Sequence, residues 1–472
     1  MNSTDLAFSP ALEQARLIRS KEISPSELTQ VYLDRIEQFN PQLGSYFTVT
    51  AELASADARA KTEQLATANS TDDLPPFFGV PISIKDLNSV AGVPCSYGVA
   101  ALRDQVSAND DAIVTRLKQA GCTILGKTAT SELGSLPYSE PVGFPPARNP
   151  WNLNYTAGGS SGGAASSVAA GLCAIAQGSD GGGSIRGPAG CCGLVGVKPS
   201  RGRISFAPIG DYLSGIVAHG PIARTVADAA AFLDVVSGYV TGDPYWLPDP
   251  NPSFLTAARD ANPGTLRIAF ASMIPPIGQA SPELEQAVLQ TVQILDVAGH
   301  TVEPAGLDFS GLIEPFINVW QTSIAFFGIP SQMLQPMNQW LLDRANGISS
   351  GQYLQAVAQM QVVSRQFVAF FDRYDVLVLP IYMYPTIRVG EWAELSPETI
   401  LQKVINWVAP CPAFNATGQP AIALPMGFDA NGLPLGVQII GRPAAESTLF
   451  GLAAQLEAAK PWLQQRPEII DN

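Results

Sequence analysis

The fold is decided by two short runs, Gly158-Gly159-Ser160-Ser161-Gly162-Gly163 and Ser179-Asp180-Gly181-Gly182-Gly183-Ser184-Ile185-Arg186. The segment between them is rich in small and apolar residues and carries little charge. Its pattern predicts a helix over about 161–171 and a buried strand over about 172–177. The second run then forms a glycine-rich turn that leads into another helix. A strand, a turn and a helix in this order are typical of an α/β fold.

Strands and helices alternate along the rest of the chain. Periodicity predicts helices at about 28–39, 51–67, 110–120 and 226–236, and short apolar strands at about 79–84, 122–125, 267–270, 376–379 and 437–440. Ser24-Pro25 precedes the first of these helices as a cap and a first-turn proline. Apolar strands between helices indicate a sheet that is covered on both faces. We therefore expect a large mixed, mostly parallel sheet in one domain over residues 1–472, with N-terminal helices over about 1–70.

Composition excludes several classes of partner. The net charge is −14, whereas phosphate binding needs clustered Lys and Arg, so no nucleic-acid partner is expected. Charged residues make up 14% of the chain, well below the roughly 25% of an average soluble domain. The most apolar stretch, 164–176, is too short to span a bilayer, and the first ten residues lack the pattern of a secretory signal. We expect a cytoplasmic protein with no membrane partner.

Metal and nucleotide chemistry are not favoured by the motifs. None of the six cysteines shows paired metal-ligand spacing, so we expect reduced thiols, no metal and no cofactor. Residues Gly121 to Thr128 match the P-loop expression G-x-x-x-x-G-K-T letter for letter. A phosphate-binding loop needs a strand before its first glycine, but here a helix precedes Gly121 and the intervening residues form a strand. The match is therefore interpreted as structural.

Histidine chemistry is nearly excluded by the count, because the chain contains only His219 and His300. His300 lies in Ala298-Gly299-His300-Thr301, a predicted helix-to-strand turn, and we expect it at the surface. His219 has neither a nearby G-x-S-x-G motif nor a metal-ligand partner. A Ser-His-Asp hydrolase is therefore disfavoured.

A serine nucleophile without histidine needs another base. Backbone N–H groups of residues 181–184 would surround the Ser184 hydroxyl, as stabilisation of an acyl-transfer oxyanion requires. The natural base is a lysine that is kept neutral by desolvation. Lys85 and Lys127 both end buried-looking strands. Residue patterns alone do not choose between them.

These motifs, taken together and in this order, make the chain similar to the amidase signature family. The resemblance extends over most of the chain and rests on Gly79-Val80-Pro81, Lys85-Asp86, Leu125 to Thr128, Arg148 to Trp151, Gly158 to Gly163, Gly183 to Ala189, Gly193 to Pro199, Gly220 to Asp228, Gly418 to Ala421 and Gly436 to Gly441. It implies an α/β/α sandwich around a mixed sheet, in which a serine acyl-enzyme cleaves a carboxamide bond.

The resemblance also implies roles for matching residues. Ser184 would be the nucleophile, Ser160 a bridging hydroxyl on a cis peptide bond, and Lys85 the base, whereas Lys127 would be structural. Asp180 and Arg186 would brace the turn, with Ser161 as a further supporting residue. The oxyanion and the substrate would be bound by Gly181, Gly182, Gly183 and Gly134.

The substrate side is expected in a variable wall over about 300–410, which is rich in aromatic residues and poor in charge. Its aromatic candidates are Phe316, Trp320, Phe326, Phe327, Trp340, Tyr382, Tyr384 and Trp407. We expect a small apolar, aryl or oligomeric amide, of the 6-aminohexanoate type, and a homodimer is possible. The alternatives are an A-type subunit of a glutaminyl-tRNA amidotransferase and a non-catalytic amidase-like binding module.

Overall fold

The computed structural model describes residues 2–211 and 213–470. Over these residues, one sheet of eleven strands runs through the molecule in the order β1-β3-β2-β6-β8-β7-β14-β15-β13-β9-β12. Its strands are β1 (Tyr46–Val49), β2 (Pro81–Lys85), β3 (Thr123–Thr128), β6 (Ile175–Asp180), β7 (Val195–Lys198), β8 (Ala218–Ala223), β9 (Arg267–Phe270), β12 (Thr301–Pro304), β13 (Val376–Pro380), β14 (Ala421–Phe428) and β15 (Pro434–Gly441). Two small hairpins pair β4 (Arg148–Asn149) with β5 (Asn152–Thr156), and β10 (Met273–Ile274) with β11 (Gly278–Gln279).

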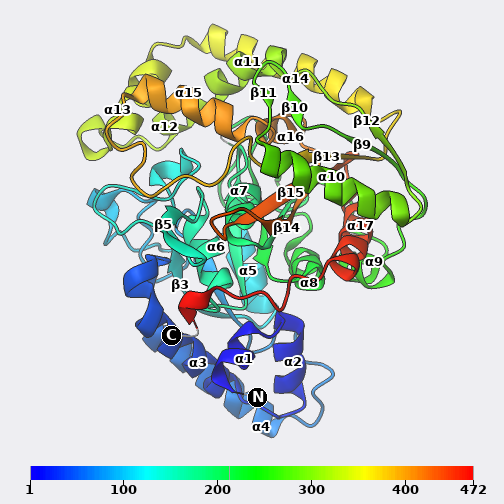
Figure 1. The fold of residues 1–472 in the computed structure, drawn as a ribbon. Helices are drawn as coiled ribbons and strands as arrows, with labels where there is room; N and C mark the ends of the chain where they lie inside the picture. Colours follow the sequence, from blue (N-terminus) through cyan, green and yellow to red (C-terminus); the bar gives the residue numbers. More distant parts are fainter. Residues whose placement is uncertain (1, 212, 471–472) are drawn as a thin grey trace.

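Helices surround this sheet (Figure 1). Those of the first half are α1 (Ser3–Phe8), α2 (Ala11–Arg19), α3 (Pro25–Leu43), α4 (Ala51–Thr67), α5 (Ala112–Gln119), α6 (Gly162–Ala169), α7 (Arg186–Cys192) and α8 (Val226–Val236). Those of the second half are α9 (Phe254–Asp260), α10 (Pro282–Val297), α11 (Ser310–Gln321), α12 (Ser323–Phe326), α13 (Pro336–Asn346), α14 (Ser350–Phe370), α15 (Pro397–Val408), α16 (Pro412–Ala416) and α17 (Glu446–Ala459). The predicted helices correspond to α3, α4, α5 and α8, and Ser24 forms a complete capping box with Glu27 at the start of α3.

The mixed α/β sheet is confirmed, but the expectation of mostly parallel pairing is wrong. Within the eleven-stranded sheet of the described residues, four neighbouring pairs are parallel (β2–β3, β2–β6, β9–β13 and β9–β12) and six are antiparallel. Two of the antiparallel pairs, β7–β8 and β14–β15, join strands that follow each other in the chain with no helix between them among the described residues. The turn between β14 and β15, for example, is closed by the Leu433 N–H, which donates to Asp429 Oδ1 at 2.8 Å. So short a connection permits only antiparallel neighbours.

Two strand boundaries differ from the prediction. The strand predicted over 172–177 is found at β6, because the Leu172 N–H still donates to Ser167 O at the end of α6. β3 extends to Thr128, so the residues that match a P-loop belong largely to a strand. A Cβ placed on Gly126 would lie 2.2 Å from Thr48 O, which shows that a neighbouring backbone occupies the space.

Alternation along β15 shows how both faces of the sheet are covered, as predicted. A Cβ placed on Gly436 would lie 2.8 Å from the Cα of Gly190 in α7. On the opposite face, a Cβ on Gly441 would lie 3.1 Å from Leu449 in α17. Figure 1 shows α1 to α4 gathered at one end of the molecule and α11 to α15 at the other. The later helices therefore form a separate wall above the sheet.

The expectation that His300 is a surface residue is wrong. Its ring is buried, with Nδ1 accepting from the Leu266 N–H at 3.1 Å and Nε2 lying 2.9 Å from Gln455 Oε1. The turn after α10 is covered because it packs between β9 and α17. All six cysteines are buried and free. Within residues 2–211 and 213–470, we find no helix that is both long and apolar enough to cross a membrane.

Candidate active site

Ser184 lies in the turn that joins β6 to α7. Gly183 in this turn has φ +120°, and a Cβ at that position would lie 2.8 Å from Cys411 Cβ, so only glycine fits. Gly181, Gly182, Gly183 and Ser184 together line one side of a large cavity. Ser184 is partly exposed there. The turn therefore presents a hydroxyl and several backbone N–H groups to the same space.

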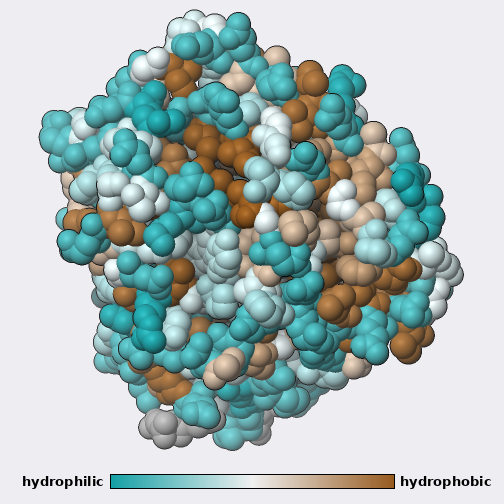
Figure 2. Space-filling view, turned by 45° about the horizontal axis from the view of Figure 1, so that its top comes forward, coloured by the Kyte–Doolittle hydropathy of each residue, from teal (hydrophilic) through white to brown (hydrophobic). Residues whose placement is uncertain are grey.

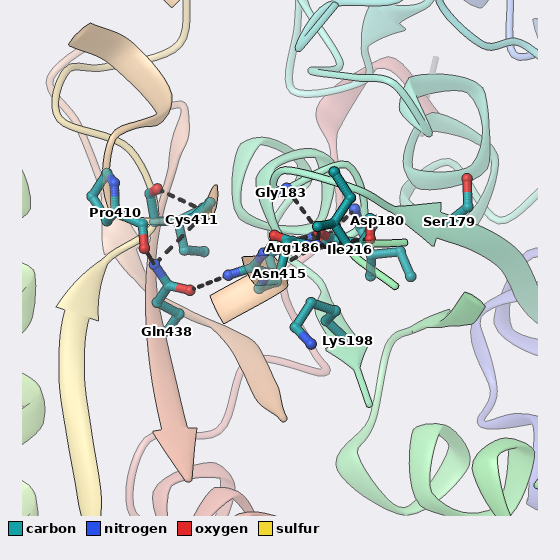
Figure 3. Close-up of polar contacts among 12 residues, drawn as sticks. Ser179, Asp180, Gly183, Arg186, Lys198, Ile216, Pro410, Cys411, Asn415 and Gln438 are labelled. Atoms are coloured by element: carbon teal, nitrogen blue, oxygen red, sulfur yellow. Dashed lines mark hydrogen bonds and ion pairs between the residues drawn. The ribbon is translucent and has the colours of Figure 1, made fainter. Parts of the chain in front are cut away.

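The carboxylate of Asp180 holds this turn in place (Figure 3). Oδ1 accepts from the Gly183 N–H at 2.7 Å, and Oδ2 accepts from the Ile185 N–H at 3.1 Å. Arg186 donates to both oxygens through Nε and Nη2, each at 3.0 Å. Burial alone would raise the pKa of Asp180, but the Arg186 guanidinium outweighs it and holds this pKa below its ordinary value. The carboxylate is therefore ionised, and both of its oxygens accept hydrogen bonds from the protein.

This contact changes the predicted set of oxyanion donors. The Gly183 N–H points to Asp180 and is not available to a substrate. In the part of the chain that the structure describes, the N–H groups of Gly181, Gly182 and Ser184 have no protein acceptor. These three groups remain candidates for binding a negatively charged oxygen.

Two further residues that the sequence did not single out complete the support. Asn415 Oδ1 accepts from Arg186 Nη2 at 2.6 Å, and its Nδ2 donates to Asp180 Oδ1 at 2.9 Å. Gln438 Oε1 accepts from Arg186 Nη1 at 2.8 Å. Figure 3 shows both side chains converging on Arg186 from α16 and β15. A polar residue inside an apolar strand could have indicated a buried role for Gln438. The sequence around Asn415 contains no comparable signal.

Lys85 is brought to Ser160 at the end of β2. Its side chain is fully buried, and Nζ lies 2.7 Å from Ser160 Oγ and 3.0 Å from Ser179 Oγ. Burial lowers the pKa of Lys85 to about 7, although the negative charge of Asp180 opposes this shift. The Gly159–Ser160 peptide bond is cis, as the family resemblance predicts. A buried lysine with such a pKa can exist as a neutral amine near pH 7.

Lys127 has a different environment. Its Nζ lies 2.8 Å from Asp86 Oδ1 in an ion pair that is buried on both sides. The other oxygen of Asp86 accepts from the Ser96 N–H at 3.0 Å. The structure thus separates the two lysines that residue patterns left equivalent: Lys85 meets a serine, and Lys127 meets a carboxylate.

In the described part of the chain, the Ser184 hydroxyl has no hydrogen bond to Ser160 or Lys85. Among the described residues it forms no hydrogen bond, although the Ser161 N–H donates to Ser184 O at 3.2 Å. The Ser161 hydroxyl donates to Ser179 O at 3.2 Å, which ties the two glycine-rich runs together. Hydrogen bonds between catalytic groups are often long before a substrate binds. Ser161 therefore stands as a structural support between Ser160 and the turn.

The cavity beside the turn is open to solvent, and the space between its atoms, solvent included, is about 930 Å³. Of the eight predicted aromatic residues, only Phe316, Trp320 and Tyr382 line it. Trp407 instead packs against Tyr382 and Trp392 behind the wall. Gly134 also lines the cavity, as do aliphatic side chains that the sequence did not single out: Leu312, Ile313, Ile317, Leu401, Val404, Ile405 and Val408. Figure 2 shows hydrophobic side chains gathered around a hollow on this face.

His219 is close to the site but does not join it. Its ring stacks on Phe206, and Nδ1 lies 3.4 Å from Gln177 Nε2. Burial and the nearby Lys85 lower the pKa of His219 to about 3, so it stays neutral. Within the described residues it has no hydrogen bond to Ser160 or Ser184.

A sequence model of the family named Amidase matches residues 27–450. This chain belongs to the amidase signature family. A protein of Synechocystis sp. with a provisional amidase name is 53% identical over 96% of this chain and 89% of its own length. The 6-aminohexanoate-cyclic-dimer hydrolase of Paenarthrobacter ureafaciens is 32% identical over 100% of this chain and 98% of its own.

The fold agrees with this membership. A solved structure of 6-aminohexanoate cyclic dimer hydrolase complexed with substrate superposes with a TM-score of 0.91 at 31% identity, covering 98% of this chain and 99% of that one. This amidase signature protein is thus an enzyme that hydrolyses carbon–nitrogen bonds, other than peptide bonds, in amides.

The different environments of buried and exposed lysines predict different effects on stability. Lys127→Ala leaves the Asp86 carboxylate buried without its partner, which should lower the free energy of unfolding by about 3–5 kcal/mol. Lys118→Ala is the matched control, because Lys118 pairs with Asp110 at the surface. This substitution should lower the free energy of unfolding by less than about 1 kcal/mol. Urea denaturation measures both. Equal stability of the two variants would contradict the structural role of Lys127.

Proposed function

We propose that this amidase hydrolyses a small neutral amide through an acyl-enzyme on Ser184, with Ser160 and Lys85 as the relay. The observation that carries the proposal is the contact of 2.7 Å between Lys85 Nζ and Ser160 Oγ. Lys85 has no carboxylate partner among the described residues, unlike Lys127, so nothing compensates a charge on it directly. An unpaired, buried amine is the state in which a lysine can act as a base.

The first half of the reaction follows from these positions. Neutral Lys85 accepts the proton of the Ser160 hydroxyl, and Ser160 accepts the proton of Ser184. The Ser184 oxygen then attacks the amide carbonyl carbon. The contact for the first transfer, between Lys85 and Ser160, is present at 2.7 Å, and we expect the contact between Ser160 and Ser184 to form when the substrate binds. Ser160 serves as the link because Lys85 has no direct bond to Ser184.

The second half uses the turn and the same relay in reverse. The oxyanion accepts hydrogen bonds from the N–H groups of Gly181, Gly182 and Ser184, whose geometry the Asp180 carboxylate fixes through Gly183. Ser160 returns a proton to the leaving nitrogen, and the C–N bond breaks. Water then attacks the acyl-enzyme with the relay again acting as base. No metal ion is required for any of these steps.

The cavity supports a neutral substrate. Among the described residues that line it, none has a charged side chain. Burying apolar groups there contributes about 0.8 kcal/mol for each methylene. The related hydrolase named above acts on a cyclic dimer, which has amide groups but no charged ends. Apolar, aryl and oligomeric amides therefore fit this site better than glutamine, whose α-amino and carboxylate groups would lie unpaired.

The role of Ser184 predicts a loss of activity without a loss of structure. Ser184→Ala should reduce kcat by at least about 10⁴-fold, and Ser160→Ala should cost several orders of magnitude, because members of one relay act as a unit. Ser167→Ala is the matched control, since that buried hydroxyl donates to Ala164 O within α6. Initial rates on hexanamide, with circular dichroism of each variant, measure these effects. Near-normal turnover by Ser184→Ala would refute the assignment, and a strong preference for glutamine would favour the amidotransferase alternative.

The base predicts a pH dependence. Because Lys85 acts as the neutral amine and its pKa is lowered to about 7, kcat/KM should rise about tenfold per pH unit below pH 7 and then reach a plateau. The apparent pKa belongs to the coupled relay. Lys198 is a useful control, because burial also lowers its pKa to about 7 while its Nζ donates to Pro199 O. In Lys198→Met, kcat/KM should still increase with pH up to about pH 7. Lys85→Met should have no measurable activity at any pH. A rate that falls from pH 6 to pH 8 would contradict this base.

A further inference from the structure

We infer that the cavity has an amine side and an acyl side, and that Phe316 sets the size of the acyl group. The inference rests on the serine mechanism proposed above. It assigns directions within the site. Three groups fix these directions: the oxyanion turn, Ser160 and the wall formed by α11.

The amine side is fixed by Ser160. A Cβ placed on Gly134 would lie 3.5 Å from Ser160 Oγ. A Cβ on Gly159 would lie 2.7 Å from the carbonyl carbon of Pro137, so the segment 134–137 lies directly against the Gly159–Ser160 peptide. Ser160 must return a proton to the leaving nitrogen, and proton transfer requires contact. The leaving amine therefore faces the segment 134–137.

The acyl side is assigned to the part of the cavity beside Gly182. A Cβ placed on Gly182 would lie 3.7 Å from Phe316 Cζ and 3.9 Å from Pro412 Cγ. The ring of Phe316 thus stands beside Gly182, whose N–H is one of the proposed oxyanion donors. A carbonyl carbon bound to Ser184 directs its oxygen to the turn and its nitrogen to Ser160. Its remaining substituent, the acyl chain, faces Phe316.

The wall on this side is apolar along its length. Leu312, Phe316 and Trp320 recur every four residues and so occupy one face of α11. Leu401, Val404 and Val408 contribute the lining from α15. In the described part of the chain, the lining provides no charged side chain that could pair with a carboxylate or an ammonium. A charged acyl chain would lose its hydration without compensation. The acyl group is therefore neutral, and Phe316, next to the turn, limits its bulk.

Two substrate series separate the sides. The acyl series contains p-nitroanilides of linear acids from acetate to decanoate, together with the 6-aminohexanoyl and adipoyl anilides. The amine series contains hexanoyl amides of ammonia, methylamine, butylamine and aniline. We expect kcat/KM of the wild type to increase with acyl length up to an optimum. The two charged anilides should be at least about tenfold less efficient than hexanoyl anilide.

Variants then assign the residues. Phe316→Ala should move the acyl optimum to longer or bulkier chains, mainly through KM, and leave the order of the amine series unchanged. Phe316→Leu should give a smaller shift in the same direction and serves if the alanine variant does not fold. Leu136→Ala should reorder the amine series alone. Phe326→Ala is the matched control, because that ring is 54% exposed on α12 and does not line the cavity.

The outcomes are distinct. A Phe316 variant that reorders the amine series but not the acyl series would overturn the inference, as would a preference for the charged anilides. Both of these results would be obtained with an active wild-type enzyme, so neither would contradict the serine mechanism itself. A folded wild type that cleaves no member of either series would overturn the proposed function and this inference with it.

Discussion

The arrangement of the site depends on one buried carboxylate. Asp180 ends the strand that leads to the turn, and its oxygens accept from the N–H groups of Gly183 and Ile185 and from the guanidinium of Arg186. A buried charge is tolerated only when it is paired and hydrogen-bonded. Asn415 and Gln438 accept two further hydrogen bonds from the Arg186 guanidinium. Because Asp180 holds the turn from the side away from the cavity, the N–H groups of Gly181, Gly182 and Ser184 remain without a protein acceptor among the described residues.

The register of two neighbouring strands separates the two lysines. Lys85 pairs across the sheet with Thr128, whereas Lys127 pairs with Ile84. Side chains alternate between the faces of a sheet, so a shift of one residue sends the lysines to opposite sides. One then reaches Ser160, and the other reaches Asp86. The same residue type at the end of adjacent strands thus gives a candidate base in one case and a structural ion pair in the other.

Much of the fold could be predicted from the chain, because helix caps and apolar strands are local signals. Ser24-Pro25 marked the start of α3, and the run before Lys85 marked β2. The antiparallel centre of the sheet could not be predicted, because strand direction depends on long-range pairing. The candidate oxyanion turn could be predicted from the glycines around Ser184, but the hydrogen bond from the Gly183 N–H to Asp180 could not. Asn415 lies 235 residues from Asp180 in the sequence, and only the fold brings them together. The cavity-lining residues of α15 were not predicted either, because only the fold brings them to the site.

The central claim is that the acyl group is carried by Ser184, and trapping the intermediate tests it most directly. Wild-type enzyme mixed with p-nitrophenyl hexanoate and quenched with acid should gain the mass of one hexanoyl group. Peptide mapping should place that group on Ser184, within the peptide that contains residues 179–186. Ser184→Ala should gain none. A hexanoyl group on Ser160, or rapid turnover of hexanamide with no acyl group on any serine, would contradict the account.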